Sequence, residues 1–116
     1  MPDISMPKAT RAHTEKRHAL APGPDDAFRA FGKAVFAEGA LDRHTKQLIA
    51  VALAHVTQCP WCIESHVKAA QREGATGAQI MEAIWIAAEM RAGAAFAHSI
   101  KALELIGDDE TGMTAE

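Results

Sequence analysis

The chain has 116 residues, a formal charge of −3 and a hydrophobic fraction of 48%, which together favour a single folded domain. The small negative charge gives no reason to expect nucleic-acid binding. No apolar stretch approaches the ~18 residues that cross a membrane, and the opening residues lack the apolar block of a signal peptide. We therefore expect a cytoplasmic protein. Alanine is abundant and tyrosine is absent, a composition that favours closely packed helices over strands.

Three segments follow from the distribution of charge and apolar residues. Residues 1–22 are polar and basic with little apolar periodicity, which predicts an arm that is either a solvated tail or a short helix lying on a neighbouring subunit. Residues 23–107 are expected to form a helical domain. The acidic stretch 108–116 is expected to form a flexible tail.

The domain opens with two predicted helices. The first begins near Asp25 or Asp26 and stops at Gly39, with phenylalanine and valine residues forming its apolar stripe. Asp42 suits the N-cap of the second helix, which continues to about Thr57.

Two or three further helices complete the pattern. Pro60 suits the first position of a third helix, and Gly74 is a usual stop. Thr76 and Gln79 match a capping box that starts a fourth helix. Gly93 either kinks that helix or separates it from a fifth. With the short helix that the N-terminal arm could form, the prediction is an all-α, compact bundle of about five to six helices.

The fourth and fifth helices carry apolar residues on more than one face, too many for so small a bundle to bury. We expect subunits to cover the excess, and hence a homo-oligomer. The residues in question are Met81, Ile84, Trp85, Ile86 and Met90.

The only two cysteines are Cys59 and Cys62. In a reducing compartment such a close pair indicates redox chemistry or metal binding rather than a structural cross-link. With Pro60 as the first helical residue, Cys59 is the N-cap and Cys62 the third helical position. Both sulfurs then lie near unpaired backbone N–H groups and the positive end of the helix dipole, which lowers a thiol pKa.

His66 follows Cys62 by one helical turn, on the same face of the predicted helix. A cationic imidazole there would stabilise a thiolate, and a neutral one could accept the thiol proton. The three residues therefore resemble a nucleophile with a base and a resolving thiol.

A structural zinc site is the competing interpretation. It needs four ligands, which His55, Cys59, Cys62 and His66 could supply. The spacing is compact, however, and His55 lies across a predicted helix break. We therefore favour redox chemistry, with no bound cofactor and no metal.

From about Asp42 to Leu103 the chain resembles the alkylhydroperoxidase AhpD-like branch of the carboxymuconolactone decarboxylase family. The resemblance is carried by residues 45–66, with the Cys-X-X-Cys-X-X-X-His pattern, and by residues 82–85 and 91–99. It implies an all-α fold that assembles as trimers or hexamers. It also implies a thiol peroxidase or disulfide reductase whose substrate is a hydroperoxide and whose disulfide is reduced by an external dithiol.

The resemblance also implies a role for each site residue. Cys62 attacks the peroxide, Cys59 resolves the sulfenic acid as a disulfide, and His66 belongs to the proton relay. The family commonly has glutamate where this chain has Gln47, an amide that hydrogen-bonds but does not titrate. His55 matches a further position of the pattern and is a candidate site residue.

Trp61 stands where the founding peroxidase carries a histidine between its cysteines. An indole does not relay protons, but Trp61 could form an apolar lip for an organic substrate or serve as a core or interface aromatic.

Two other functions stay open from the sequence. One is decarboxylation or ring chemistry on a lactone, as in the other branch of the family, for which the vicinal thiols have no evident use. The other is a non-catalytic redox-sensing or zinc-binding oligomer, favoured by the absence of the relay glutamate at Gln47.

Overall fold

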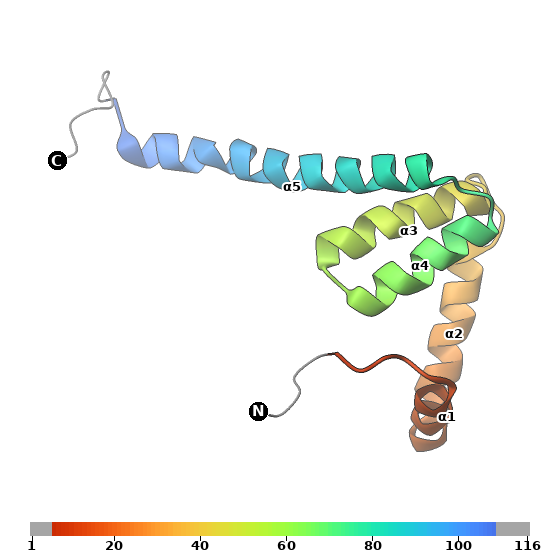
Figure 1. Ribbon diagram of the computed structural model, residues 1–116. Coiled ribbons are helices and arrows are strands. Elements are labelled where there is room, and N and C mark those ends of the chain that lie inside the picture. Colours follow the sequence, from red (N-terminus) through yellow and green to blue (C-terminus); the bar gives the residue numbers. More distant parts are fainter. Residues whose placement is uncertain (1–5, 109–116) are drawn as a thin grey trace.

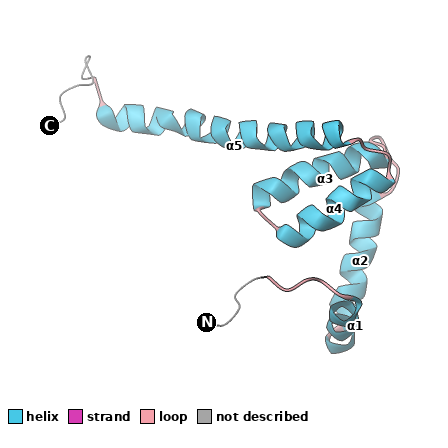
Figure 2. Ribbon diagram, in the orientation of Figure 1, coloured by secondary structure: helices cyan, strands magenta, loops and turns pink. Residues whose placement is uncertain are grey.

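A computed structural model describes residues 6–108, and within that range the chain is built from helices without strands (Figures 1 and 2). The all-α prediction is confirmed. The predicted flexibility of residues 108–116 falls almost wholly outside the described residues, as do the first five residues of the predicted arm. The five helices are α1 (Arg11–Leu20), α2 (Pro22–Phe36), α3 (Arg43–Thr57), α4 (Pro60–Arg72) and α5 (Gly77–Ile106).

Three predicted helix starts are confirmed by their hydrogen bonds. The Asp42 carboxylate accepts from the Thr45 N–H at 2.7 Å and caps α3. Cys59 is the N-cap of α4, and Pro60 is its first residue. Thr76 and Gln79 form the reciprocal capping box of α5. Each cap supplies an acceptor to an N–H that has no partner inside its helix.

The chain departs from the predicted helix pattern at its N-terminal end. Residues 11–20 form α1, which packs against α2 of its own chain. It begins at Thr10, whose side chain and His13 make a capping box. α2 begins at Pro22 rather than near Asp25, because proline is well accommodated in a first turn.

α5 runs through Gly93 without a break. A glycine inside a helix costs only about 1 kcal/mol relative to alanine, and four alanines lie within four residues of it. The helix therefore continues, and the predicted fourth and fifth helices are one.

α3 is the centre of the packed part of the bundle. It contacts both α4 and α5, and its Val51 is completely buried. The small core consists of Val51, Ala70, Ala75 and Ile80, with Leu48, Val67 and Ile84 packed against it.

The rest of the chain projects from this packed part. The second half of α5 extends away from α3 and α4, and α1 with α2 extends in another direction (Figure 1). The radius of gyration is 20.7 Å, against about 13 Å for a globular domain of this length. No helix among the described residues is long and apolar enough to cross a membrane.

Candidate functional site

The two cysteines lie at the start of α4, as the sequence predicted. Cys59 has an extended backbone (φ −100°, ψ 105°), and its sulfur accepts a hydrogen bond from the Cys62 N–H at 3.3 Å. A sulfur thus takes the place that a hydroxyl or carboxylate oxygen holds at an ordinary N-cap. Both thiols are free and half-buried, so the pair is a reduced dithiol at the positive end of a helix.

The structure distinguishes the two thiols, which the sequence argument did not. Hydrogen bonds from the side chain and then the backbone N–H of Cys62 lower the pKa of Cys59. The same thiol–thiol hydrogen bond, followed by burial and the charge of Cys59, raises the pKa of Cys62. In the reduced protein the thiolate therefore forms first at Cys59.

His66 is held by Gln47, which reaches it from α3. Its Nδ1 lies 2.8 Å from the Gln47 Oε1. An amide oxygen only accepts hydrogen bonds, so the imidazole carries its proton on Nδ1 and leaves Nε2 with a free lone pair. Gln47 thereby fixes both the tautomer and the orientation of the ring.

Phe36, the last residue of α2, covers one face of the same imidazole. The two rings are stacked, with centroids 5.2 Å apart and planes at 28°. Burial lowers the pKa of His66, because an apolar surrounding disfavours the charged form. At neutral pH His66 is consequently an uncharged base.

A lysine explains why the end of α2 lies at this site. The ammonium group of Lys46 donates to the carbonyls of Val35 and Ala37, at 2.8 and 2.6 Å. It satisfies carbonyls at the α2 C-terminus, where cations are favoured. The neighbouring residue on α3 is Gln47, so the same turn of α3 anchors α2 and binds His66.

Cys62 and His66 are separated by four residues on α4. Side chains at this spacing are neighbours on one face, with Cβ atoms about 5–6 Å apart. The lone pair on Nε2 of His66 can therefore accept a proton from a group on this face of the helix, such as the Cys62 thiol. The arrangement is a thiol pair at the start of α4 with a neutral base one turn further along the same helix.

His55 has a different environment. Its Nδ1 donates to the Val51 carbonyl of its own helix at 2.7 Å, a contact that suits a packing histidine on α3. The four donors of the zinc alternative are not gathered around one point. Within the described residues, the group whose donor atoms come close enough for one ion is instead His18, Asp25 and Asp26.

Trp61 is tied to the N-terminal segment. Its Nε1–H donates to the Pro7 carbonyl at 2.9 Å, and the indole is 39% exposed. Pro7 and Phe36 are neighbours of the site that were not predicted from the sequence. No sequence signal marks either, because each meets the site only through the packing of distant segments.

Glu64 and Glu82 do not replace the carboxylate that the family commonly has at the position of Gln47. Glu64 pairs with Lys68 at 2.9 Å, and that hydrogen bond is the main cause of its lowered pKa. Glu82 lies on α5 and lines a groove between α3 and α5. His98 donates to a carbonyl of its own helix, and His44 hydrogen-bonds to Gln79.

The fold is all-helical, with a Cys-X-X-Cys dithiol at a helix start and a neutral histidine one turn further along, held by an amide from a second helix. These features define the chain as a helical dithiol protein. The comparison with known families then places this chain. Residues 22–105 match the sequence model of the carboxymuconolactone decarboxylase family. The chain belongs to that family.

Solved structures agree with this assignment. An apo carboxymuconolactone decarboxylase family protein from Legionella pneumophila superposes with a TM-score of 0.65 at 34% identity, over 68% of this chain and 70% of that one. A protein from Methanobacterium thermoautotrophicum gives a TM-score of 0.70 at 32% identity, over 73% and 96% of the two chains.

A sequence relative in Paracoccus denitrificans is more similar still. It is described as uncharacterized protein 4 in cox locus, and it is 68% identical over 108 residues, covering 93% of this chain and 96% of its own.

Proposed function

We propose that this chain is a thiol-dependent oxidoreductase of the AhpD-like branch that reduces hydroperoxides. One observation carries the proposal. A reduced Cys59–Cys62 pair caps α4, and the base one turn away, His66, is fixed by Gln47 in the tautomer that leaves Nε2 free. A packing role alone needs neither the thiol pair nor this hydrogen bond.

The first step is the reduction of the peroxide at Cys62. His66 takes the thiol proton at Nε2, and the thiolate attacks the terminal oxygen of the hydroperoxide. The S–O bond forms as the O–O bond breaks, and the proton goes to the departing alkoxide. The products are the sulfenic acid of Cys62 and an alcohol.

The second step regenerates a closed pair. The Cys59 thiolate attacks the sulfenic sulfur: the S–S bond forms as the S–O bond breaks, and the departing hydroxide takes a proton from solvent and leaves as water. Hydrogen bonds from the side chain and then the backbone N–H of Cys62 lower the pKa of Cys59 in the reduced protein, which favours the thiolate that the resolving step needs. An external dithiol then reduces the disulfide and becomes a disulfide itself.

Gln47 acts in this scheme as a positioning residue. A glutamate in its place would orient the imidazole and would also stabilise its protonated form, since an adjacent carboxylate raises a histidine pKa. Gln47 also orients the imidazole, but its amide carries no charge. His66 therefore works as a weaker base that is neutral over a wider range of pH. We include His55 in the site only as a supporting residue of α3, because its Nδ1 is engaged by the Val51 carbonyl.

Disulfide exchange is a second candidate activity, favoured by the low pKa of Cys59. In that reaction the Cys59 thiolate attacks a substrate disulfide, forms a mixed disulfide and expels the other substrate sulfur as a thiolate. Cys62 then displaces the remaining substrate thiol. The same two residues thus serve either substrate. With a hydroperoxide Cys62 attacks first, and with a disulfide Cys59 attacks first.

The remaining parts of the proposal concern partners. We propose an external dithiol as the reductant, a homo-oligomer of trimeric or hexameric type as the assembly, and the cytoplasm as the location. The family description also keeps lactone decarboxylation as an alternative. Lactone turnover that survives replacement of both cysteines would favour that reaction over thiol chemistry.

The experiment is stopped-flow oxidation of the reduced protein by tert-butyl hydroperoxide, with free thiols counted before and after. The proposal predicts rapid loss of both thiols in the natural sequence. It predicts no rapid loss in Cys62→Ser, and a trapped sulfenic acid in Cys59→Ser. Rapid sulfenic acid formation in Cys62→Ser would mean that Cys59, and not Cys62, attacks the peroxide. Oxidation at the rate of a free thiol in the natural sequence would contradict peroxide reduction.

A further inference from the structure

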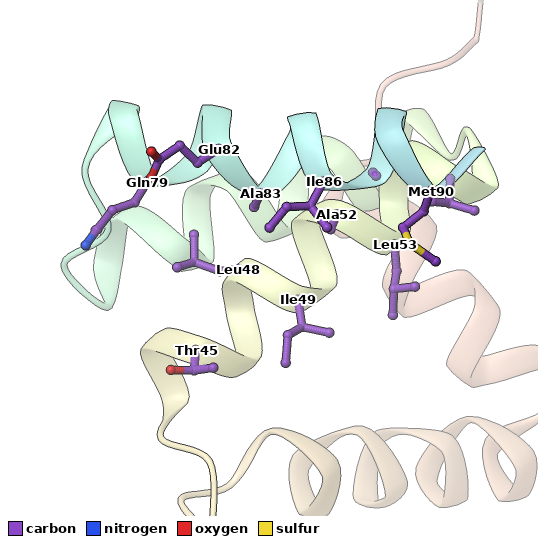
Figure 3. Close-up of a pocket in the computed structure, with 12 residues that line it drawn as sticks. Thr45, Leu48, Ile49, Ala52, Leu53, Gln79, Glu82, Ala83, Ile86 and Met90 are labelled. Atoms are coloured by element: carbon purple, nitrogen blue, oxygen red, sulfur yellow. The ribbon is translucent and has the colours of Figure 1, made fainter. Parts of the chain in front are cut away.

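The thiol pair is reached from the outer surface of α4. The large apolar groove of the chain, about 610 Å³ in volume, lies between α3 and the first half of α5 (Figure 3). Among the described residues that line this groove, none belongs to α4. The groove therefore offers no route to the two half-buried cysteines, and a substrate approaches them past the segments that flank the start of α4.

Two segments from distant parts of the chain flank Cys62. On one side, the indole N–H of Trp61 donates to the Pro7 carbonyl at 2.9 Å. On the other side, Phe36 stacks on the ring of His66, with centroids 5.2 Å apart. At about 100° per residue, Trp61 and His66 lie about 140° apart around α4, and Cys62 lies within that arc. Access to Cys62 is therefore limited to the space between these two segments.

The first of these segments, residues 6–10, forms a strap. It leads from the start of α1 back to the start of α4 (Figure 1), and all five of its residues are exposed. Its Lys8 also lies within electrostatic reach of α4. The hydrogen bond from Lys68 is the main cause of the lowered pKa of Glu64, and the charge of Lys8 adds to the effect. The strap thus lies along the first turns of the helix that carries the thiols.

The two segments are held with unequal strength. The end of α2, which carries Phe36, is anchored by the Lys46 ammonium group through its hydrogen bonds to two carbonyls of that segment. Within the part of the chain that the structure describes, a single hydrogen bond links residues 6–9 to the helices, the one from Trp61 to Pro7. One such bond shifts an equilibrium by about two- to twelvefold. The strap therefore opens more readily than the end of α2.

We propose that the strap selects, by size, the dithiols that reach the Cys59–Cys62 pair, and that Trp61 holds it closed. The inference rests on one part of the proposed function, the reduction of the disulfide by an external dithiol. A small dithiol passes between the strap and Phe36 while the strap is closed. A folded protein with a dithiol on its surface reaches the disulfide only after the strap opens. Trp61 is thus a positioning residue that acts through Pro7.

The reduction begins at the sulfur that the strap flanks. The Cys62 N–H, 3.3 Å from the Cys59 sulfur in the reduced pair, stabilises a departing Cys59 thiolate. The thiolate of the reductant therefore attacks Cys62, and its new S–S bond forms as the Cys59–Cys62 bond breaks. The second thiol of the reductant then loses its proton and attacks the reductant sulfur of the mixed disulfide, which expels the Cys62 thiolate. Both cysteines take up protons, and the reductant leaves as a disulfide.

The test compares a small and a large dithiol on the full chain. The disulfide is first formed with diamide, so the result does not depend on peroxide reduction. Its reduction is then followed with dithiothreitol and with reduced thioredoxin, and the ratio of the two rates cancels changes in the disulfide itself. Trp61→Phe keeps an aromatic ring and removes the N–H donor. We expect it to raise the ratio of the thioredoxin rate to the dithiothreitol rate by about two- to twelvefold.

Trypsin provides a direct measure of the opening, because the peptide bond after Lys8 lies within the strap. In the diamide-oxidised protein, Trp61→Phe is expected to speed cleavage at this bond by a similar factor, with circular dichroism confirming that the helices are intact. The matched control is Trp85→Phe, the same change at an exposed indole on α5. It is expected to leave both the rate ratio and the cleavage rate unchanged.

The outcomes separate this inference from the proposed peroxidase activity. An unchanged rate ratio in Trp61→Phe would overturn the inference even if cleavage is faster, since the strap would then open without limiting access. Unchanged cleavage would overturn it too, because Trp61 would not hold the strap. A disulfide that neither dithiol reduces would also overturn it. A raised ratio in a protein that tert-butyl hydroperoxide does not oxidise rapidly would reject peroxide reduction and leave the strap in place.

Discussion

Replacing Gln47 by leucine removes the hydrogen bond to His66 and keeps a side chain of nearly the same volume in its place. The bond joins Oε1 to Nδ1 at 2.8 Å. A hydrogen bond of this kind contributes about 0.5–1.5 kcal/mol net. If that energy holds the tautomer with a free Nε2, its loss slows proton transfer from the thiol roughly two- to twelve-fold.

The assay is the stopped-flow oxidation by tert-butyl hydroperoxide, repeated between pH 5 and pH 9. Gln47→Leu is expected to lower the rate without moving the pH dependence by much. Gln47→Glu restores the hydrogen bond but adds a charge, which raises the pKa of His66. The acid limb of its profile is therefore expected to move to higher pH by about one unit or more.

Gln71→Leu serves as the matched control, because Gln71 is exposed on the same helix as His66. It should leave the rate unchanged. Nitrogen NMR of the imidazole provides a readout that a purely structural role would not alter: Nδ1 is protonated in the natural sequence and only partly so in Gln47→Leu. An unchanged tautomer and an unchanged rate in Gln47→Leu would refute the positioning role.

Three other outcomes follow from the same contacts. Alkylation of the reduced protein by iodoacetamide, mapped by mass spectrometry, should label Cys59 before Cys62 below pH 8, and Cys62→Ala should slow the labelling of Cys59 by raising its pKa. Burial depresses the pKa of His66 from 6.5, so the unfolded chain binds the proton more readily. Urea midpoints should then fall as the pH drops below about 6.5, a loss that His66→Gln reduces. Asp42→Ala removes the cap of α3 and should lower the free energy of unfolding by about 1 kcal/mol in urea titrations, whereas an unchanged midpoint would mean that the bond to Thr45 contributes nothing.

The helix starts and the position of the two thiols could be predicted from the sequence, because they depend on interactions between residues close together in the chain. A cap is an interaction between residues three apart, so Asp42, Cys59 and Thr76 could be assigned to helix starts before any packing was known. The same reasoning placed the two sulfurs at the positive end of α4. Gly93 was ambiguous, since the cost of one glycine is small enough for its helical neighbours to offset.

The environment of the thiols was decided only by the tertiary structure. Gln47 and His66 are hydrogen-bonded although they are 19 residues apart in the sequence, and Trp61 and Pro7 are hydrogen-bonded although they are 54 residues apart. Such contacts depend on how helices cross and how loops turn, which no local pattern encodes. The ranking of the thiols is of the same kind, because it follows from which sulfur accepts the hydrogen bonds. The apolar excess of α5 was visible in the sequence, but only the packing of α3 against it revealed the apolar groove between the two helices.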